Sequence, residues 1–214
     1  MEDKCIKNRL LRTSSLLLLI LVLLLAASCQ KKEQPAEQRS AQSVNPYSTE
    51  TIFEETYKKV QQNPNDVEAM YHLADLYDRN AQYREAIETY QKVVKLKPDM
   101  GYAYFKMGTA YDRLNQPEEA LNAFKSAAKY LPKHAVLYNN MGIAYGKLGR
   151  LNEEINTLKT AIKLRPTYAA AHYNLGIAYL KTKNKPAARK EYEALKEFDE
   201  GTAEALLKEI EKAP

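Results

Sequence analysis

Side chains that could carry out catalysis or bind metal are sparse and widely separated in this sequence. The histidines stand at positions 72, 134 and 172, and none belongs to a His-Glu-x-x-His motif. The sequence also lacks a glycine-rich phosphate loop and a Gly-x-Ser-x-Gly motif. Ordinary packing or surface roles are the simpler interpretation of the histidines. We therefore predict that the protein is not an enzyme and that it binds no metal, cofactor or small-molecule substrate.

Cys29 is the one residue for which the sequence predicts covalent chemistry. A basic N-terminus precedes an uninterrupted apolar segment, Leu16 to Ala27, and small residues then lead to Cys29. This order is typical of an export signal. As a helix, the apolar segment would span only about 18 Å against the roughly 30 Å of a bilayer core. A stable membrane span is therefore not expected, and residues 1–28 are predicted to be a signal peptide.

The sequence Leu25-Ala26-Ala27-Ser28-Cys29 resembles the lipobox of bacterial lipoproteins, although that family prefers leucine at the place of Ala26. The resemblance implies that Cys29 is lipidated and that the protein is anchored in the bacterial cell envelope, facing the periplasm. The alternative is an incidental cysteine beside an ordinary secretion signal. Gln30 resembles the residue that directs such lipoproteins to the outer membrane. Because Cys5 lies in the segment to be removed, the mature chain cannot form an internal disulfide.

Residues 29–47 are predicted to be a flexible polar tether. This segment is rich in Gln, Lys, Glu, Ser and Ala, contains Pro35 and Pro46, and has too few large apolar residues to form a core. A tether of this kind holds a folded domain away from the membrane without fixing its orientation.

One pattern returns every 34 residues through the rest of the chain. Small residues are each followed, three positions later, by a tyrosine, and prolines close three of the units. A period of this length is the mark of a helical repeat array, in which each unit is buried by its neighbours. The small residues are Ala74, Gly108, Gly142 and Gly176, the tyrosines are Tyr77, Tyr111, Tyr145 and Tyr179, and the prolines are Pro98, Pro132 and Pro166.

These residues resemble the tetratricopeptide repeat. The resemblance implies an all-α fold, a right-handed superhelical solenoid of antiparallel helix pairs, with about four and a half repeats and a C-terminal cap helix. The expected parts are a capping half-repeat at 48–66, four repeats at 67–100, 101–134, 135–168 and 169–200, and a capping helix at 201–214. In this scheme the repeated tyrosines belong to the core. Glu154 stands where the repeat has alanine, so either its helix shifts or the acid finds a partner.

In this family the first helix of each repeat lines a concave groove that binds a protein or peptide. Tyr71, Phe105 and Tyr173 either contribute to such recognition or pack between neighbouring first helices, and the sequence leaves both interpretations open. We also expect one end of the groove to be acidic and the other apolar and basic. The predicted groove residues are Tyr71, Asp75, Asp78, Arg79, Phe105, Thr109, Asp112, Arg113, Asn139, Ile143, Lys147, Tyr173, Asn174, Ile177 and Lys181, with Tyr102 and Asn140 beside them.

The formal net charge of +5 does not indicate a nucleic-acid partner. Basic and acidic residues are interspersed along the repeats, which is typical of a solvated surface. We therefore predict a non-enzymatic, membrane-anchored scaffold for a protein or peptide partner. The alternatives are a pilotin-like assembly factor for pili or secretion, and a regulatory subunit of an envelope enzyme.

Overall fold

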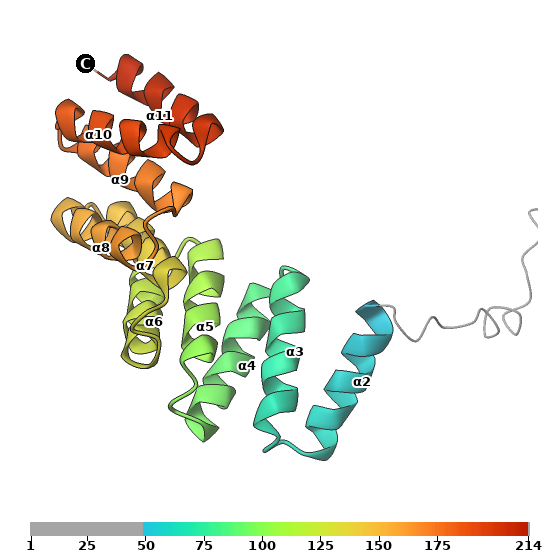
Figure 1. Cartoon of the computed structure of the whole chain (residues 1–214). Coiled ribbons are helices and arrows are strands. Elements are labelled where there is room, and N and C mark those ends of the chain that lie inside the picture. The colour runs from blue at the N-terminus through green and yellow to red at the C-terminus, as the bar shows by residue number, and fades with distance from the viewer. Residues whose placement is uncertain (1–48, 214) are drawn as a thin grey trace, which may run out of the picture. The chain divides into compact units, whose positions relative to one another are not determined.

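The computed structural model describes residues 49–213 of the chain, and these form ten helices with no strand among them. The predicted signal peptide, Cys29 and the predicted tether lie outside the described residues. The first helix is α2 (Thr49–Gln62), and four helix pairs follow it along the chain (Figure 1). The pairs are α3 (Val67–Arg79) with α4 (Tyr83–Leu96), α5 (Gly101–Arg113) with α6 (Pro117–Tyr130), α7 (Ala135–Lys147) with α8 (Leu151–Leu164), and α9 (Ala169–Lys181) with α10 (Lys185–Lys196). The last helix is α11 (Glu200–Lys212).

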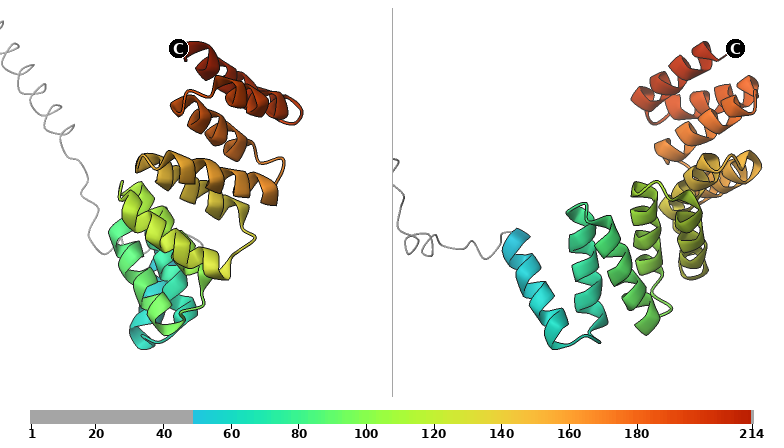
Figure 2. Two further views of the ribbon diagram at one scale, coloured as in Figure 1. Left: turned by 90° about the vertical axis from the view of Figure 1, so that its left-hand side faces the viewer. Right: turned by 180° about the vertical axis from the view of Figure 1, so that it is seen from behind.

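Each helix packs against the helices before and after it, and the first helices of successive pairs also contact one another. Figure 2 shows the same succession of helix pairs from two further sides. The four first helices begin at Val67, Gly101, Ala135 and Ala169, which are 34 residues apart. The described residues therefore form an all-helical solenoid in which every pair is buried by its neighbours.

Polar side chains cap the N-termini of several helices by accepting hydrogen bonds from backbone N–H groups that have no partner within the helix. Asp66 accepts a hydrogen bond from the Ala69 N–H at 2.9 Å, and Asp199 does the same for Thr202 at 2.9 Å. Asn184 caps α10 through the Ala187 N–H at 3.1 Å. These local bonds fix where α3, α10 and α11 begin.

The turn within each helix pair uses the left-handed backbone region at one repeated position. The φ angles are 58° at Ala81, 55° at Asn115, 71° at Gly149 and 57° at Lys183. These residues are also 34 positions apart, yet only one of them is glycine, the residue that adopts this conformation most readily. Glycine and asparagine adopt this conformation readily, whereas at Ala81 and Lys183 the tertiary contacts of the helix pairs impose it.

The small residues of the pattern are required by close contact between helices. A Cβ added at Gly108 would lie 2.6 Å from ring carbons of Phe124, and one at Gly142 would lie 2.8 Å from Leu158 Cγ. In the last pair, the Cβ of a residue at Gly176 would meet Leu206 of α11 at 2.6 Å. The capping helix thus packs directly on α9, and its Ala203, Leu206 and Ile210 are buried.

The repeated tyrosines are less buried than the sequence indicates. Tyr145 is buried, whereas Tyr77, Tyr111 and Tyr179 are half-buried and pack at the edges of the apolar clusters. The Arg150 guanidinium lies 4.8 Å from the centre of the Tyr145 ring, and Lys159 lies 5.8 Å from that of Tyr179. These rings therefore pack on the core with one part of their surface and contact basic side chains with another.

Candidate functional site

The predicted groove residues all lie on α3, α5, α7 and α9, and we call the surface that they form the first-helix face. Its four basic residues, Arg79, Arg113, Lys147 and Lys181, are exposed and lie in the last turn of each helix, where they interact favourably with the negative end of the helix dipole. Asn139 is buried, and the remaining members are half-buried. The face therefore presents partly covered side chains and not a row of freely solvated ones.

The aromatic residues of the face rest on the core rings beneath them. The Tyr71 ring lies 5.8 Å from that of Tyr90, and the Phe105 ring lies 6.1 Å from Phe124 and 5.0 Å from His134. Both thus pack within the solenoid while remaining half exposed. Tyr102 is 50% exposed and touches His134 only by an edge contact at 5.7 Å. It offers the most accessible aromatic surface of this region.

Ion pairs between neighbouring first helices neutralise much of the charge on the face. Lys106 Nζ on α5 contacts Asp75 on α3 at 2.6 Å, and Lys147 on α7 contacts Asp112 on α5 at 2.6 Å. Asp75 also pairs with Arg79 at 2.8 Å. Burial alone would raise the pKa of Asp75, but Lys106 and Arg79 lower it. These ion pairs neutralise acids on α3 and α5, whereas α7 and α9 bring basic residues and no acidic ones to the face, and the change from an acidic to a basic end stays a prediction.

Asp78 differs from the other acids of the face because it has no ion pair among the described residues. It stands one repeat before Asp112, and Arg113 stands one repeat before Lys147. Burial raises the pKa of Asp78, and the nearby cations Lys106 and Arg113 only partly offset that effect. Burial raises the pKa of the Tyr90 hydroxyl on α4, and the neighbouring Asp75 carboxylate raises it further. Asp78 is therefore an acid of the face that no base neutralises by direct contact within residues 49–213.

Glu154, which stands where the repeat has alanine, forms an ion pair with Lys181. Its side chain is 5% exposed, and Oε1 accepts a hydrogen bond from Lys181 Nζ of the next pair at 2.8 Å. Gly146 makes this possible, because a Cβ there would lie 2.5 Å from Glu154 Oε1. Gly146 stands where the two preceding repeats have Asp78 and Asp112. Glu154 thus supplies, from the second helix, the acid that the first helix lacks.

Two asparagines join α7 and α9 in the same region. Asn174 Nδ2 donates to Asn139 Oδ1 at 2.9 Å, and Asn139 Nδ2 donates to Asn140 Oδ1 at 3.3 Å. The buried Asn139 therefore positions Asn174 and Asn140, which are half-buried and can still contact a bound molecule.

His172 is held inside the last helix pair by two hydrogen-bond acceptors. Its Nδ1 lies 2.7 Å from Glu191 Oε2, and its Nε2 lies 2.9 Å from the Pro166 carbonyl oxygen. Both ring nitrogens can donate only when the imidazole is protonated. Burial alone would lower the pKa of His172, but the bonds to Glu191 and Pro166 outweigh it and raise the pKa. This histidine is a packing residue, as the sequence analysis proposed.

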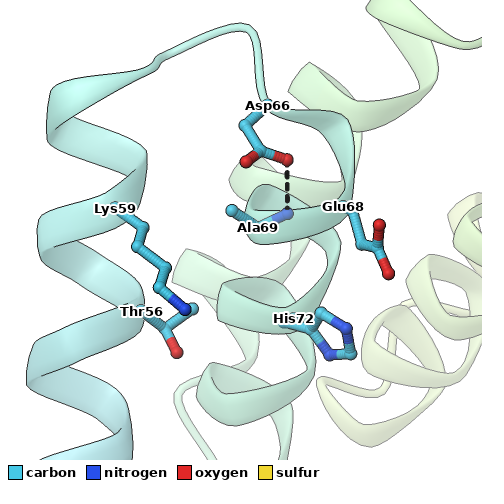
Figure 3. Close-up of a pocket in the computed structure, with 6 residues that line it drawn as sticks. All are labelled: Thr56, Lys59, Asp66, Glu68, Ala69 and His72. Carbon is cyan, nitrogen blue, oxygen red and sulfur yellow. Dashed lines mark hydrogen bonds between the residues drawn. The ribbon is translucent and has the colours of Figure 1, made fainter.

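The other two histidines also have structural surroundings. His134 Nδ1 accepts the Leu137 N–H at 3.1 Å and so caps α7, and burial lowers its pKa. His72 lines an opening of about 310 Å³ between α2 and α3, together with Lys59, Asp66 and Glu68 (Figure 3). Within residues 49–213 no three His, Cys, Asp or Glu side chains are grouped so that they could hold a metal ion.

This arrangement of helix pairs and a shared first-helix face defines a helical-repeat solenoid, and family models identify the repeats. Tetratricopeptide-repeat models match residues 105–155 and 169–202, and a model described as TPR repeat matches 147–183. A further model, of anaphase-promoting complex, cyclosome, subunit 3, matches residues 48–127. Comparison with curated proteins found no match.

Solved structures show the same fold. MamA from Desulfovibrio magneticus RS-1 is 22% identical, with a TM-score of 0.68 over 72% of this chain and 86% of that one. YrrB, described as a TPR protein with an unusual peptide-binding site, is 22% identical, with a TM-score of 0.67 over 75% of this chain and 84% of that one. A TPR protein of Thermus thermophilus is 24% identical, with a TM-score of 0.57 over 77% of this chain and 90% of that one. Together, these matches support the tetratricopeptide-repeat family for this chain.

We predict that Lys181→Met will destabilise the protein, because it leaves the buried Glu154 carboxylate without a cation. Lys181 is itself 41% exposed, so we expect a loss of about 1 to 3 kcal/mol, below the value for a fully buried pair. Urea unfolding measures this loss. The control is the double variant Glu154→Ala with Lys181→Met, which should recover most of the stability. If Lys181→Met unfolds at the same urea concentration as the native chain, the pair does not contribute.

We predict that the stability contributed by His172 will decrease as pH rises. The pKa of His172 is higher in the folded chain than its usual value near 6.5. Its contribution is therefore fully present below about pH 6.5 and is lost as pH rises through the folded pKa. Chemical unfolding between about pH 5 and about pH 9 should show this loss, and His172→Phe should remove that part of the pH dependence. The same pH profile in both proteins would contradict the prediction.

Proposed function

We propose that the protein is a non-enzymatic scaffold that binds a protein or peptide partner in a concave groove formed by its first-helix face. We further propose that Cys29 carries a lipid that anchors the chain in the bacterial cell envelope, facing the periplasm, at the outer membrane. The described domain would then stand off the membrane on the polar segment 29–47. The binding proposal depends on one observation: α3, α5, α7 and α9 together present partly covered side chains on the first-helix face.

The chemistry of this face suits recognition of a polypeptide. It combines a half-exposed aromatic residue, Tyr102, with amide groups at Asn140 and Asn174 and charged groups at Asp78 and Arg113. Aromatic and arginine side chains are enriched at protein interfaces, and amides can pair with a peptide backbone. The half-buried Asp78 carboxylate, which has no ion pair within residues 49–213, and the exposed Arg113 offer an acceptor and donors to one extended chain. The peptide-binding site named for YrrB, a protein of the same fold, agrees with this proposal.

The anchor proposal rests on the order of residues before Cys29. No helix among residues 49–213 is long and apolar enough to cross a membrane. The basic start, the short apolar segment and the small residues at its end are the features of an export signal, and the residues up to Cys29 resemble a lipobox. Anchoring by several acyl chains would be stable, because each buried methylene contributes about 0.8 kcal/mol.

We predict that Tyr102→Ala will weaken partner binding by about tenfold, because Tyr102 contributes exposed aromatic area without supporting the core. Cross-linking in cells followed by mass spectrometry would identify partner peptides joined to Lys106 or Lys147 and measure their loss. Tyr57→Ala on α2 is the matched control, since Tyr57 is 44% exposed and lies outside the first-helix face. Tyr71 and Phe105 are poorer probes because they rest on Tyr90 and Phe124. Equal cross-links in the two variants would refute the groove.

We predict that labelled palmitate will be incorporated into the native chain and into Cys5→Ser, but not into Cys29→Ser. Cys5 lies in the segment to be removed and is therefore a matched control for the loss of a thiol. The label is measured on the purified chain together with the mass of its N-terminus. A native chain that is cleaved before Cys29 but carries no label would show ordinary secretion instead of lipidation.

A further inference from the structure

The connections that lead from a second helix to the next first helix form a basic edge of the array. We use this name for residues 92–100, 126–134 and 160–168, which contain the ends of α4, α6 and α8 and the connection that follows each. They hold seven Lys and Arg residues against one acidic residue, Asp99, a net charge of +6. Figure 1 shows the connection from α4 to α5 on the other side of the array from the turn between α3 and α4. Positive charge is therefore concentrated on one side of three successive units.

The opposite edge of the same units has the opposite charge. Residues 78–86, 112–120 and 146–154, at the turns within the pairs, hold five Lys and Arg residues against seven Asp and Glu residues, a net charge of −2. Helix dipoles favour bases at helix ends and acids at helix starts, so they would bring acids to the starts of α5, α7 and α9. The first turns of these three helices contain no acidic residue. The helix dipole therefore explains the bases of the basic edge but not its lack of acids.

The cations of the basic edge are available to a partner. All seven are exposed, and none forms an ion pair within residues 49–213. By contrast, Lys106, Lys147 and Lys181 on the first helices each contact a carboxylate. The seven are Lys92, Lys95, Lys97, Lys129, Lys133, Lys163 and Arg165. An anionic surface could therefore approach this edge without breaking any ion pair of the described chain.

Two large apolar side chains are exposed among these cations. Leu96 and Tyr130 are the last residues of α4 and α6, 34 positions apart, and they are 46% and 44% exposed. The Tyr130 ring stacks on that of Tyr104, with the ring centres 6.2 Å apart. A Cβ added at Gly101 would lie 2.8 Å from Tyr130 Cβ, so the glycine permits this close approach. The ring is therefore held at the edge by its contacts while part of its surface remains in solvent.

Contacts between the connections make the basic edge one continuous surface. The Cβ of a residue at Gly101 would also lie 2.8 Å from Leu131 Cγ, so the connection before α5 touches the one before α7. Burial lowers the pKa of His134, and the nearby charge of Arg165 in the next connection lowers it further. The edge ends there, because residues 196–200 hold one Lys against three acids. The basic edge thus covers the first three of the four units.

This mixture of lysines and exposed apolar residues suits the surface of an anionic bilayer. Lysine is depleted at protein interfaces, whereas lysine and tyrosine both favour the headgroup region of a membrane. Nucleic acid would attract the same cations, but it gives no reason for Leu96 to be exposed. Proximity also favours a membrane. If Cys29 carries a lipid, 19 residues separate it from Thr49, and a flexible chain of that length spans about 25 Å.

We propose that the basic edge binds the surface of an anionic phospholipid bilayer, with its cations at the headgroups and with Leu96 and Tyr130 inserted between them. The choice of a membrane rests in part on the proposed lipid anchor, which would hold the chain at a bilayer without orienting it. Docking through the basic edge supplies the orientation. Asp78 and Arg113 lie in or next to the last turns of their helices, at the opposite edge, and so remain accessible to a polypeptide.

Vesicle binding tests the charge of the basic edge. The described residues form a compact unit with its own core, so a chain that begins at residue 30 keeps the fold and lacks Cys29. This chain should cosediment with vesicles of phosphatidylglycerol and phosphatidylcholine in equal parts, but not with vesicles of phosphatidylcholine alone. Added salt should weaken the binding, because it screens exposed charges.

Neutralising one lysine in each connection provides the decisive variant. The triple variant Lys95→Gln, Lys129→Gln and Lys163→Gln should bind anionic vesicles about a hundredfold more weakly. The matched control removes three exposed cations from elsewhere on the chain, Arg84→Gln, Lys183→Gln and Arg189→Gln, and should bind like the native chain. Circular dichroism confirms that both triple variants are folded.

The absence of tryptophan from the chain allows the position of one ring to be tested directly. Tyr130→Trp introduces a single indole at the basic edge, and its emission should shift to shorter wavelength on anionic vesicles as the ring leaves water. Tyr57→Trp on α2 is the matched control, since Tyr57 is also 44% exposed and lies outside the basic edge. Its emission should not change when vesicles are added.

Several results would overturn the inference. They are equal binding by the two triple variants, equal binding to anionic and neutral vesicles, or no shift of the Tyr130→Trp emission. Tighter binding to a short DNA duplex than to anionic vesicles would make the basic edge a nucleic-acid surface instead. Unchanged vesicle binding by the lysine variant, together with loss of its cellular cross-links, would make it a protein interface.

The vesicle test is independent of the anchor, because the chain that it uses lacks Cys29. A native chain without palmitate label, beside normal vesicle binding, would refute the anchor and retain the basic edge. A labelled native chain whose shortened form fails to bind anionic vesicles would retain the anchor and refute the basic edge.

Discussion

The whole array depends on one short contact in each unit, where a residue with little or no side chain meets a large apolar group. Gly108 lies against the Phe124 ring and Gly142 against Leu158. The distance between paired helices is set there, since interiors are close-packed and a single additional methyl group would force the helices apart. The distances between side chains on the first-helix face therefore depend on these contacts. The last unit meets the same requirement differently, because Gly176 receives Leu206 from α11.

The helices and their order could be predicted from the sequence because the 34-residue pattern reports packing within each unit. Prolines, small residues and tyrosines mark local constraints that act over a few turns of helix. The left-handed turns at Ala81 and Lys183 could not be predicted, because alanine and lysine carry no preference for that conformation. The left-handed conformation is required only because these residues connect two helices that pack antiparallel.

The side-chain pairing on the face could be predicted only in part. The sequence places acids and bases on the correct helices, but which acid meets which base depends on the distance between units. Lys106 and Asp75 are 31 residues apart in the chain, and Lys147 and Asp112 are 35 apart, so no short-range pattern links them. The one usable signal was the glycine at 146, where the two preceding units have aspartate. As a result, the face is less charged than its composition indicates, and the recognition that we propose for it would depend more on shape, aromatic surface and the few groups that remain unpaired.

The contact among Gly146, Glu154 and Lys181 also bears on how freely the units could be exchanged. Repeat arrays are often treated as interchangeable modules, since each unit touches only its neighbours. Here three residues from two adjacent units depend on one another: the glycine leaves room for the carboxylate, and the lysine neutralises it. A unit taken from elsewhere in the array would bring an aspartate or an alanine to one of these places and break the set. The third and fourth repeats therefore form one interdependent structural module, and a junction for shuffling or shortening the array belongs on either side of them.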